Sequence, residues 1–136
     1  MDERRILDTL REIRTTALAS YSNFHVAAIL ETEEGRHFTG INIESSSYGL
    51  TICAERVALF KALSEGERRF RRIYLLADGE KLCTPCGACR QVLMDYAPDI
   101  EVVMFLESGV AERLPLTELL PMAFGSRHLP GSRSDA

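Results

Sequence analysis

The chain has 136 residues, which is enough for one domain and too few for two. Hydrophobic residues make up 46% of it, so the chain can bury a substantial core. Its 16 basic and 20 acidic side chains leave a formal net charge of −4. A mildly acidic domain lacks the positive surface that follows a polyphosphate backbone, which argues against long nucleic acid as a partner.

The sequence also argues against a membrane segment and an export signal. The longest apolar runs have five residues, far below the roughly 20 that a spanning helix needs. Residues 2–5 are all charged and an amphipathic pattern follows them, which is unlike the apolar segment of a signal peptide. We therefore expect a cytoplasmic protein whose four cysteines are thiols or metal ligands rather than disulfides.

The first predicted element is a helix over residues 2–19, because Ile6, Leu10, Ile13 and Ala17 recur on one helical face. Short apolar runs between turn residues predict the strands, and longer segments that end at Gly66 or Pro98 predict the next helices. The strands are expected over 24–31, 37–42, 73–77, 102–106 and, as a short fifth, 111–114. The later helices are expected over 52–65, 86–97 and from 117 to 120.

This order of elements predicts the fold class. A hairpin followed by alternating helices and strands indicates an α/β fold, with a mixed sheet of four or five strands and helices on its faces. Residues 1–125 are expected to form the single domain. Residues 126–136 are rich in Gly, Ser, Arg and Pro, and we expect them to form a flexible C-terminal tail.

Two short motifs predict a metal site. Cys86 and Cys89 lie at i and i+3 at the start of a predicted helix, so their sulfurs can share one metal ion. Cys53 begins another predicted helix, 33 residues earlier. The pattern therefore predicts one zinc ion between two helix N-termini, held by three thiolates and left with one open coordination position.

The neighbours of these cysteines indicate catalysis. Two helix N-termini supply partial positive charge, and Arg56 can donate to the cysteine sulfurs, so a bound water can become acidic. Glu55 then lies where it can carry protons between that water and a leaving nitrogen. The alternatives are a structural zinc site with Cys83 as the fourth ligand, and a zinc-binding domain without enzymatic activity. Glu55 argues against both, because a structural site has no use for a carboxylate beside an open metal position.

A motif of Cys-x-Glu followed by Pro-Cys-x-x-Cys is the pattern of the zinc deaminases. From Tyr21 to about Phe124 the chain resembles the small, homotetrameric cytidine deaminases. The matching segments are Tyr21-Ser22-x-Phe24-x-Val26, Asn42-Ile43-Glu44, Tyr48-Gly49-Leu50-Thr51-x-Cys53-Ala54-Glu55-Arg56, Pro85-Cys86-Gly87-Ala88-Cys89-Arg90-Gln91 and Leu119-Leu120-Pro121-x-Ala123-Phe124.

The resemblance implies a three-layer α-β-α sandwich with a mixed five-stranded sheet. It also implies hydrolytic deamination of cytidine or deoxycytidine in pyrimidine salvage, in which zinc-activated water attacks ring carbon C4. Cys53, Cys86 and Cys89 would hold one zinc ion per chain. Glu55 would protonate ring N3, deprotonate the water and deliver a proton to the leaving ammonia.

The resemblance further implies how a nucleoside is bound. Asn42 and Glu44 would hydrogen-bond the ribose hydroxyls, and the backbone of Ala54 would contact the pyrimidine. The aromatic residues would surround the substrate: Phe24 would pack on the nucleoside, Tyr48 would lie in a wall shared between subunits, and Phe124 would come from a neighbouring subunit of the homotetramer.

Three residues depart from the family pattern, namely His25, Ala27 and Ser45. The segment around His25 is similar to the related blasticidin S deaminases, which act on a cytosine carried by a different sugar. A deaminase of a modified or antibiotic cytosine nucleoside is therefore the alternative function. Asn42 and Arg56 favour the ordinary nucleoside, and His25 is interpreted as a side chain on the polar face of its strand.

Overall fold

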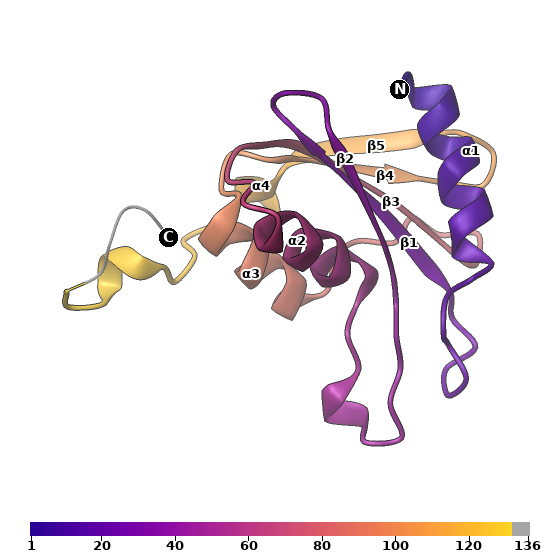
Figure 1. Cartoon of the computed structure of the whole chain (residues 1–136), viewed down its shortest axis with the longest axis horizontal. Helices are drawn as coiled ribbons and strands as arrows, with labels where there is room; N and C mark the ends of the chain where they lie inside the picture. The colour runs from indigo at the N-terminus through magenta and orange to yellow at the C-terminus, as the bar shows by residue number, and fades with distance from the viewer. Residues whose placement is uncertain (132–136) are drawn as a thin grey trace.

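Within residues 1–131, which the computed structural model describes, five strands form one mixed sheet that is the middle layer of the protein (Figure 1). Their order is β2-β1-β3-β4-β5, with β3 and β4 parallel and the other neighbours antiparallel. The strands are β1 (Val26–Thr32), β2 (His37–Ile41), β3 (Phe70–Ala77), β4 (Glu101–Phe105) and β5 (Ala111–Pro115).

Helix α1 (Glu3–Arg14) covers one face of the sheet. Asp2 caps its first turn, and Ile6 and Leu10 are fully buried on the face that packs against the sheet. The helix ends five residues before the predicted boundary at 19. The side chains of Thr15 and Thr16 donate to carbonyls three residues back, and the chain then pairs with the loop after β2 instead of continuing the helix.

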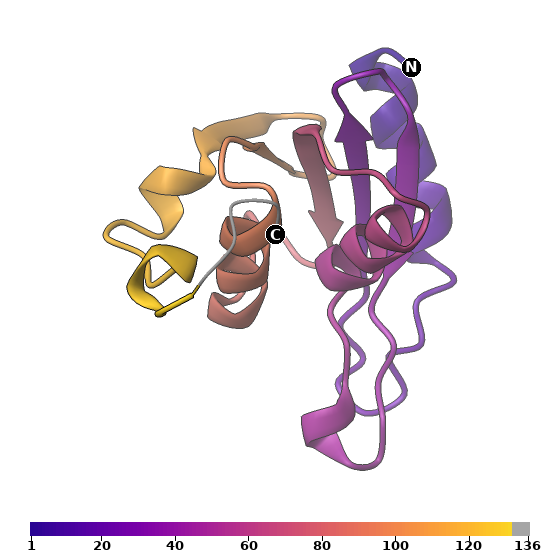
Figure 2. The same cartoon turned by 60° about the vertical axis from the view of Figure 1, so that its left-hand side comes forward.

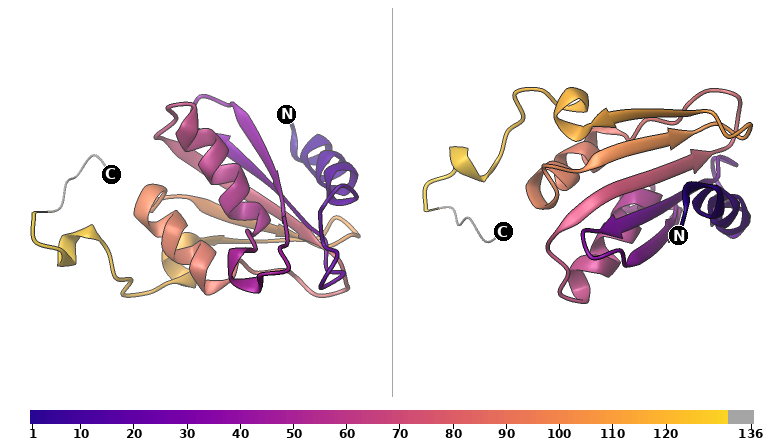
Figure 3. Two further views of the ribbon diagram at one scale, coloured as in Figure 1. Left: turned by 60° about the horizontal axis from the view of Figure 1, so that its bottom comes forward. Right: turned by 90° about the horizontal axis from the view of Figure 1, so that it is seen from above.

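The opposite face is covered by α2 (Ala54–Ser64) and α3 (Gly87–Tyr96), which lie side by side (Figure 3, left), and by the short α4 (Leu116–Leu119). The protein is therefore the three-layer α-β-α sandwich with a mixed five-stranded sheet that the resemblance implied. Each face has its own hydrophobic core. The core beneath α2 and α3 includes Val26, Ala28, Leu30, Ala58, Leu59, Ile73, Leu75 and Leu93, and the core beneath α1 includes Ala27, Ile29, Tyr74, Leu76, Val103 and Phe105.

Two loops extend from one end of the sheet and run side by side (Figures 1 and 2). One follows α1, and the other joins β2 to α2 and carries the 3-10 helix η1 (Tyr48–Leu50). Backbone hydrogen bonds of 3.0 Å join Leu18 in the first loop to Asn42 and Glu44 in the second. At this end of the molecule the loops support each other through backbone contacts rather than through a helix or strand.

The C-terminal segment leads away from the three layers (Figure 1). It contains a second 3-10 helix, η2 (Ser126–His128), within the region predicted as a flexible tail. The last part of that predicted tail, residues 132–136, lies outside the described residues. In the described part of the chain, no helix combines the length and the hydrophobicity needed to cross a membrane.

The position of α2 depends on a glycine in β2. A Cβ atom at Gly40 would lie 2.2 Å from the carbonyl oxygen of Ala54 and 2.7 Å from the backbone nitrogen of Ala58. Both are atoms of the α2 backbone, which cannot move aside as a flexible side chain would. Glycine at this position therefore allows the first turns of α2 to pack directly on the sheet.

We expect Gly40→Ala to lower the free energy of unfolding by about 1–3 kcal/mol, because the added methyl group must push α2 away from β2. Urea denaturation followed by circular dichroism measures this change. Gly49→Ala is the matched control, since a Cβ atom there meets nothing within 4 Å. Equal stability of the two variants would contradict the close approach described here.

Candidate metal centre and active-site cavity

Three cysteine sulfurs meet where α2 and α3 begin. Cys53 directly precedes α2, Cys86 directly precedes α3, and Cys89 lies in the first turn of α3. The Sγ atoms of Cys53 and Cys86 are 3.7 Å apart, those of Cys86 and Cys89 are 3.5 Å apart, and all three lie within 4.8 Å of one another. Tetrahedral zinc with Zn–S bonds of about 2.3 Å requires sulfurs roughly 3.8 Å apart, so the cluster has the right size for one zinc ion.

The proton affinities of the sulfurs also fit a cation. Hydrogen bonding from the Cys89 thiol, together with Arg56, lowers the pKa of Cys53 to about 5. The same hydrogen bond raises the pKa of Cys89, because a second thiolate would stand beside the first. A divalent cation removes that repulsion, so binding it releases the remaining protons and stabilises three thiolates together.

Helix ends and one arginine add positive charge around the sulfurs. The N-termini of α2, with 11 residues, and of α3, with 10, both point at the cluster. A guanidinium nitrogen of Arg56 lies 3.6 Å from Cys53 Sγ. The Nε atom of Arg56 is buried and has no hydrogen-bond partner within residues 1–131. Arg56 is therefore placed to hold Cys53 and to offset the charge of the thiolates.

Glu55 is the second residue of α2 and lies next to this cluster. Its side chain is among the few buried charged groups of the described chain, with 4% of the residue exposed. Burial is the main cause that raises the pKa of Glu55 to about 7, and the nearby Cys53 thiolate adds to the rise. A carboxyl group in this environment can hold a proton in one state and release it in another.

A cavity of about 300 Å³ opens directly onto Cys53, Glu55 and Cys86. Its size lies at the lower end of the range for small-molecule sites. The walls come from three parts of the chain, namely the loop before β1 with the first residue of that strand, the segment from the end of β2 into the first turn of α2, and the loop before α3. They consist of Ser22, Phe24, Val26, Asn42, Glu44, Thr51, Cys53, Ala54, Glu55, Cys83, Thr84 and Cys86.

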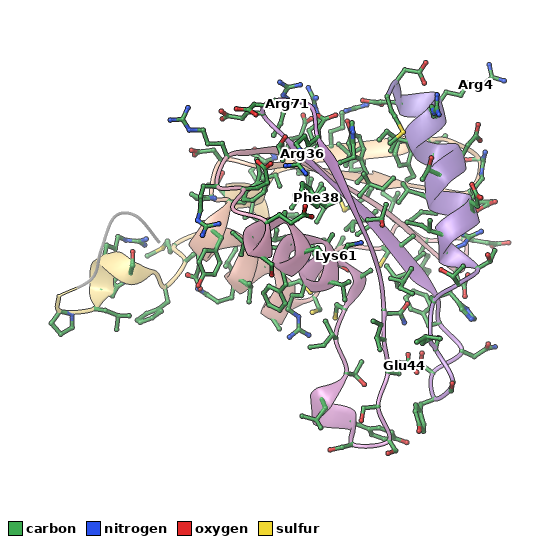
Figure 4. All side chains as sticks on the ribbon, viewed as in Figure 1. Arg4, Arg36, Phe38, Glu44, Lys61 and Arg71 are labelled. Atoms are coloured by element: carbon green, nitrogen blue, oxygen red, sulfur yellow. The ribbon has the colours of Figure 1, made fainter. Side chains whose placement is uncertain are left out.

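Asn42 and Glu44 lie together in the wall of the cavity. Asn42 Nδ2 is 3.4 Å from a carboxylate oxygen of Glu44, and Figure 4 shows Glu44 between the two extended loops. The backbone N–H groups of Tyr21 and Ser22 donate to this carboxylate at 2.9 Å, and the Ser22 hydroxyl also donates to it. The contacts with Ser22 are the main reason that the pKa of Glu44 is lowered.

Two of the residues predicted to bind substrate, Tyr48 and Phe124, lie outside this cavity. Tyr48 is 75% exposed and lies at a second, adjoining hollow of about 370 Å³ with Tyr21 and Glu44. Phe124 is 57% exposed and stacks on His128 with ring centroids 5.2 Å apart. Within one chain, therefore, neither aromatic ring covers the space beside Glu55, whereas Phe24 and Ala54 do line it.

Cys83 contributes to the cavity wall but not to the sulfur cluster. The group of possible metal ligands in the described chain contains Cys53, Cys86 and Cys89 and not Cys83. Burial raises the pKa of Cys83 to about 11, which keeps it a neutral thiol. Three polar wall residues, Ser22, Thr51 and Thr84, have no role predicted from the sequence. Ser22 and Thr51 lie within the segments that resemble the family, and only that position in the sequence could have indicated that they line the cavity.

Comparison with known proteins agrees with this geometry. A family model of the cytidine and deoxycytidylate deaminase zinc-binding region matches residues 2–106. A cytidine deaminase of Halalkalibacterium halodurans is 43% identical over 91% of this chain and 95% of its own length. The crystal structure of cytidine deaminase from Burkholderia pseudomallei superposes with a TM-score of 0.86 at 41% identity, and the match covers 91% of this chain and 100% of that chain.

A blasticidin-S deaminase of Bacillus cereus is also similar, with 29% identity over 82% of this chain and 84% of its own length. The family model, the identity to named cytidine deaminases and the three-sulfur cluster agree with one another. The chain therefore belongs to the cytidine and deoxycytidylate deaminase family and is a zinc enzyme, and its Cys53, Cys86 and Cys89 form a cluster suitable for one metal ion.

Proposed function

We propose that the protein hydrolyses cytidine and deoxycytidine to uridine and deoxyuridine, with release of ammonia, in pyrimidine salvage. The observation that carries this proposal is the position of Glu55, buried beside the sulfur cluster and open to the same cavity. A structural zinc site needs no such carboxylate. All four cysteines are free thiols, which suits a cytoplasmic enzyme.

Zinc bound to three thiolates supplies a water molecule of lowered pKa at its open coordination position. The chain's own contribution is proton transfer and orientation. Glu55 would take two protons from the attacking water in turn: it would deliver the first to ring N3, and then move the second from the new hydroxyl on C4 to the leaving amino nitrogen. The net reaction consumes one water and releases ammonia, and Glu55 returns to its starting state. Arg56 keeps Cys53 in place during these changes of charge.

Substrate binding is proposed to involve Asn42 and Glu44 as acceptors for the sugar hydroxyls. The amide nitrogen of Asn42 already donates to Phe24 O and approaches Glu44, while Asn42 Oδ1 accepts from Val26 N at 2.9 Å. A carbonyl oxygen and a carboxylate both keep further lone pairs. The two side chains therefore offer acceptors to a diol, while Phe24 and the backbone of Ala54 contact the base.

The alternative substrate is a modified or antibiotic cytosine nucleoside of the blasticidin S type. The segment around His25 and the similarity to the Bacillus cereus blasticidin-S deaminase motivate this alternative. However, His25 is not among the residues that line the cavity, whereas Asn42 and Glu44 are. The cavity wall therefore favours an ordinary nucleoside.

A homotetramer with shared active sites is the assembly that we propose. Phe124 and Tyr48 are exposed and lie outside the cavity of their own chain, and Leu50 beside Tyr48 is 69% exposed. Large apolar side chains in such positions are characteristic of protein interfaces. A neighbouring chain could thus close the cavity with rings that one chain leaves unused.

The substrate range tests the proposed function. We expect rapid turnover of cytidine and deoxycytidine, and little of cytosine, CMP or blasticidin S, measured by the change in ultraviolet absorbance. Free cytosine lacks the hydroxyls that Asn42 and Glu44 accept, and the Glu44 carboxylate would repel a nearby 5′-phosphate. Turnover of cytosine or CMP equal to that of cytidine would contradict the assigned sugar contacts, and a preference for blasticidin S would establish the alternative.

Replacing Glu55 tests the mechanism. Glu55→Gln keeps the size of the side chain but cannot carry a proton, so we expect kcat to fall by about 10⁴-fold or more. Metal analysis of Glu55→Gln should still find one zinc per chain. The same analysis should find one zinc per chain in Cys83→Ser, because Cys83 is not in the sulfur cluster, and no zinc in Cys86→Ser. Glu118→Gln on the exposed side of α4 is the matched control with unchanged activity. A near-native rate for Glu55→Gln would show that another group transfers the protons.

Subunit mixing tests the shared site. Light scattering should give a mass of about 61 kDa, four times the chain mass of 15.2 kDa. We expect Glu55→Gln and Phe124→Ala chains each to have little activity, and their mixture to regain part of it, because hybrid sites combine an intact Glu55 with an intact Phe124. A fully active monomer, or no recovery after demonstrated subunit exchange, would overturn the shared site.

A further inference from the structure

The segment from Phe24 to Val26 forms one wall of the cavity and is held from the cavity side by Asn42. The Asn42 side chain accepts from Val26 N at 2.9 Å and donates to Phe24 O at 2.8 Å. These two contacts flank His25. Any shift of this segment therefore moves both Phe24, which faces the base, and Asn42, which faces the sugar.

His25 holds the same segment from the opposite side. Side chains alternate along an extended chain, and Val26 and Ala28 belong to the core under α2 and α3 while Ala27 and Ile29 belong to the core under α1. His25 thus points toward α1, and it is not among the residues that line the cavity. A side chain on this face cannot touch the substrate but can fix the strand from behind.

The partner of His25 is Asp78, the residue that follows β3. Asp78 Oδ2 accepts from the backbone N–H of His25 at 2.9 Å and lies 2.6 Å from its ring Nδ1. Asp78 N donates back to His25 O at 3.0 Å. These three contacts between one pair of residues extend the antiparallel pairing beyond the first residue of β1 and the last residue of β3.

Arg14 anchors this pair to α1. Arg14 is the last residue of the helix, its Nε lies 3.7 Å from Asp78 Oδ1, and its guanidinium donates to Ala77 O at 3.2 Å. Glu107 lies 2.9 Å from the other side of the same guanidinium. The carboxylate of Asp78 is therefore held between a fixed cation and the imidazole, and it cannot rotate away without breaking contacts on both sides.

We propose that His25 and Asp78 are positioning residues for the nucleoside: together they lock the Phe24–Val26 wall against Asn42 and so set the affinity for the sugar and base. This inference rests on the proposed function of the cavity. The proton carrier Glu55 and the cysteines belong to α2, α3 and the residues directly before them, on the other face of the sheet. Loosening the wall should therefore weaken binding and leave the chemical step nearly unchanged.

The test compares steady-state kinetics of variants of the full-length protein with cytidine. His25→Leu removes the ring contact with Asp78 at similar size, and Asp78→Ala removes the acceptor. We expect each variant to raise KM about tenfold. This corresponds to the lower end of the free energy that a hydrogen bond to a charged group contributes. We expect kcat to stay within about threefold, the signature of lost ground-state binding. Asp78→Ala also serves as the second variant should His25→Leu not fold.

Three further measurements separate positioning from a general loss of stability. His25→Asn places an amide N–H where ring Nδ1 stood, and it should restore most of the wild-type KM. The double variant of His25→Leu and Asp78→Ala should be no worse than Asp78→Ala alone, because without the Asp78 carboxylate the His25 ring has lost its partner. His37→Leu breaks a comparable pair, with Nε2 3.1 Å from Glu31, at the other end of the β1–β2 hairpin, and should leave KM unchanged.

An unchanged KM in folded His25→Leu and Asp78→Ala, a loss confined to kcat, or additive effects in the double variant would each overturn the proposal. A rise of KM in His37→Leu equal to that in His25→Leu would do the same, since it would show only a stability effect. Failure of the proposed function has a different signature, because the wild-type protein itself would then not turn over cytidine.

Discussion

The active site depends on two helix N-termini that meet at one point. Three sulfurs within 4.8 Å of one another repel each other once all are thiolates, and the partial positive charge at the starts of α2 and α3 adds to that of a bound cation in offsetting this repulsion. The start of α2 reaches this point while its first turns pack directly on β2 at Gly40. Gly40 therefore bears on the position of α2, and the position of α2 in turn bears on Cys53 at its start.

Much of this arrangement could be predicted from the sequence, because local patterns carry it. The apolar runs specify the five strands, and both central helices begin within two residues of the predicted positions. The spacing of Cys86 and Cys89 specifies their common side of α3 without knowledge of the rest of the fold. The convergence with Cys53 is different, since it depends on pairing between distant strands; it could be predicted only because Cys53 stands in a second motif, Cys-x-Glu, at the start of another predicted helix.

Three features of the fold could not be predicted from the sequence, because each depends on contacts beyond the local pattern. The end of α1 was placed at residue 19 because Ala17 continues the apolar pattern, yet threonine hydroxyls and pairing with the loop after β2 end the helix at Arg14. The sequence predicts His25 as a side chain on the polar face of its strand. Its contact with Asp78 could not be predicted, because Asp78 lies 53 residues later in the chain. The close approach at Gly40 involves a backbone that the local sequence does not specify.

Polar contacts, rather than a hydrophobic core, hold together the two extended loops that contribute to the cavity wall. These loops expose Leu18, Tyr48 and Leu50, so they gain little from apolar burial within one chain. Instead, the Glu44 carboxylate accepts hydrogen bonds from the backbone N–H groups of Tyr21 and Ser22 in the first loop. The Asn42 side chain accepts one from Val26 N at the start of β1. Side chains that must hold loops in this way are already oriented before a ligand arrives, so binding requires less additional ordering. The same residues can therefore support the wall and recognise what enters it.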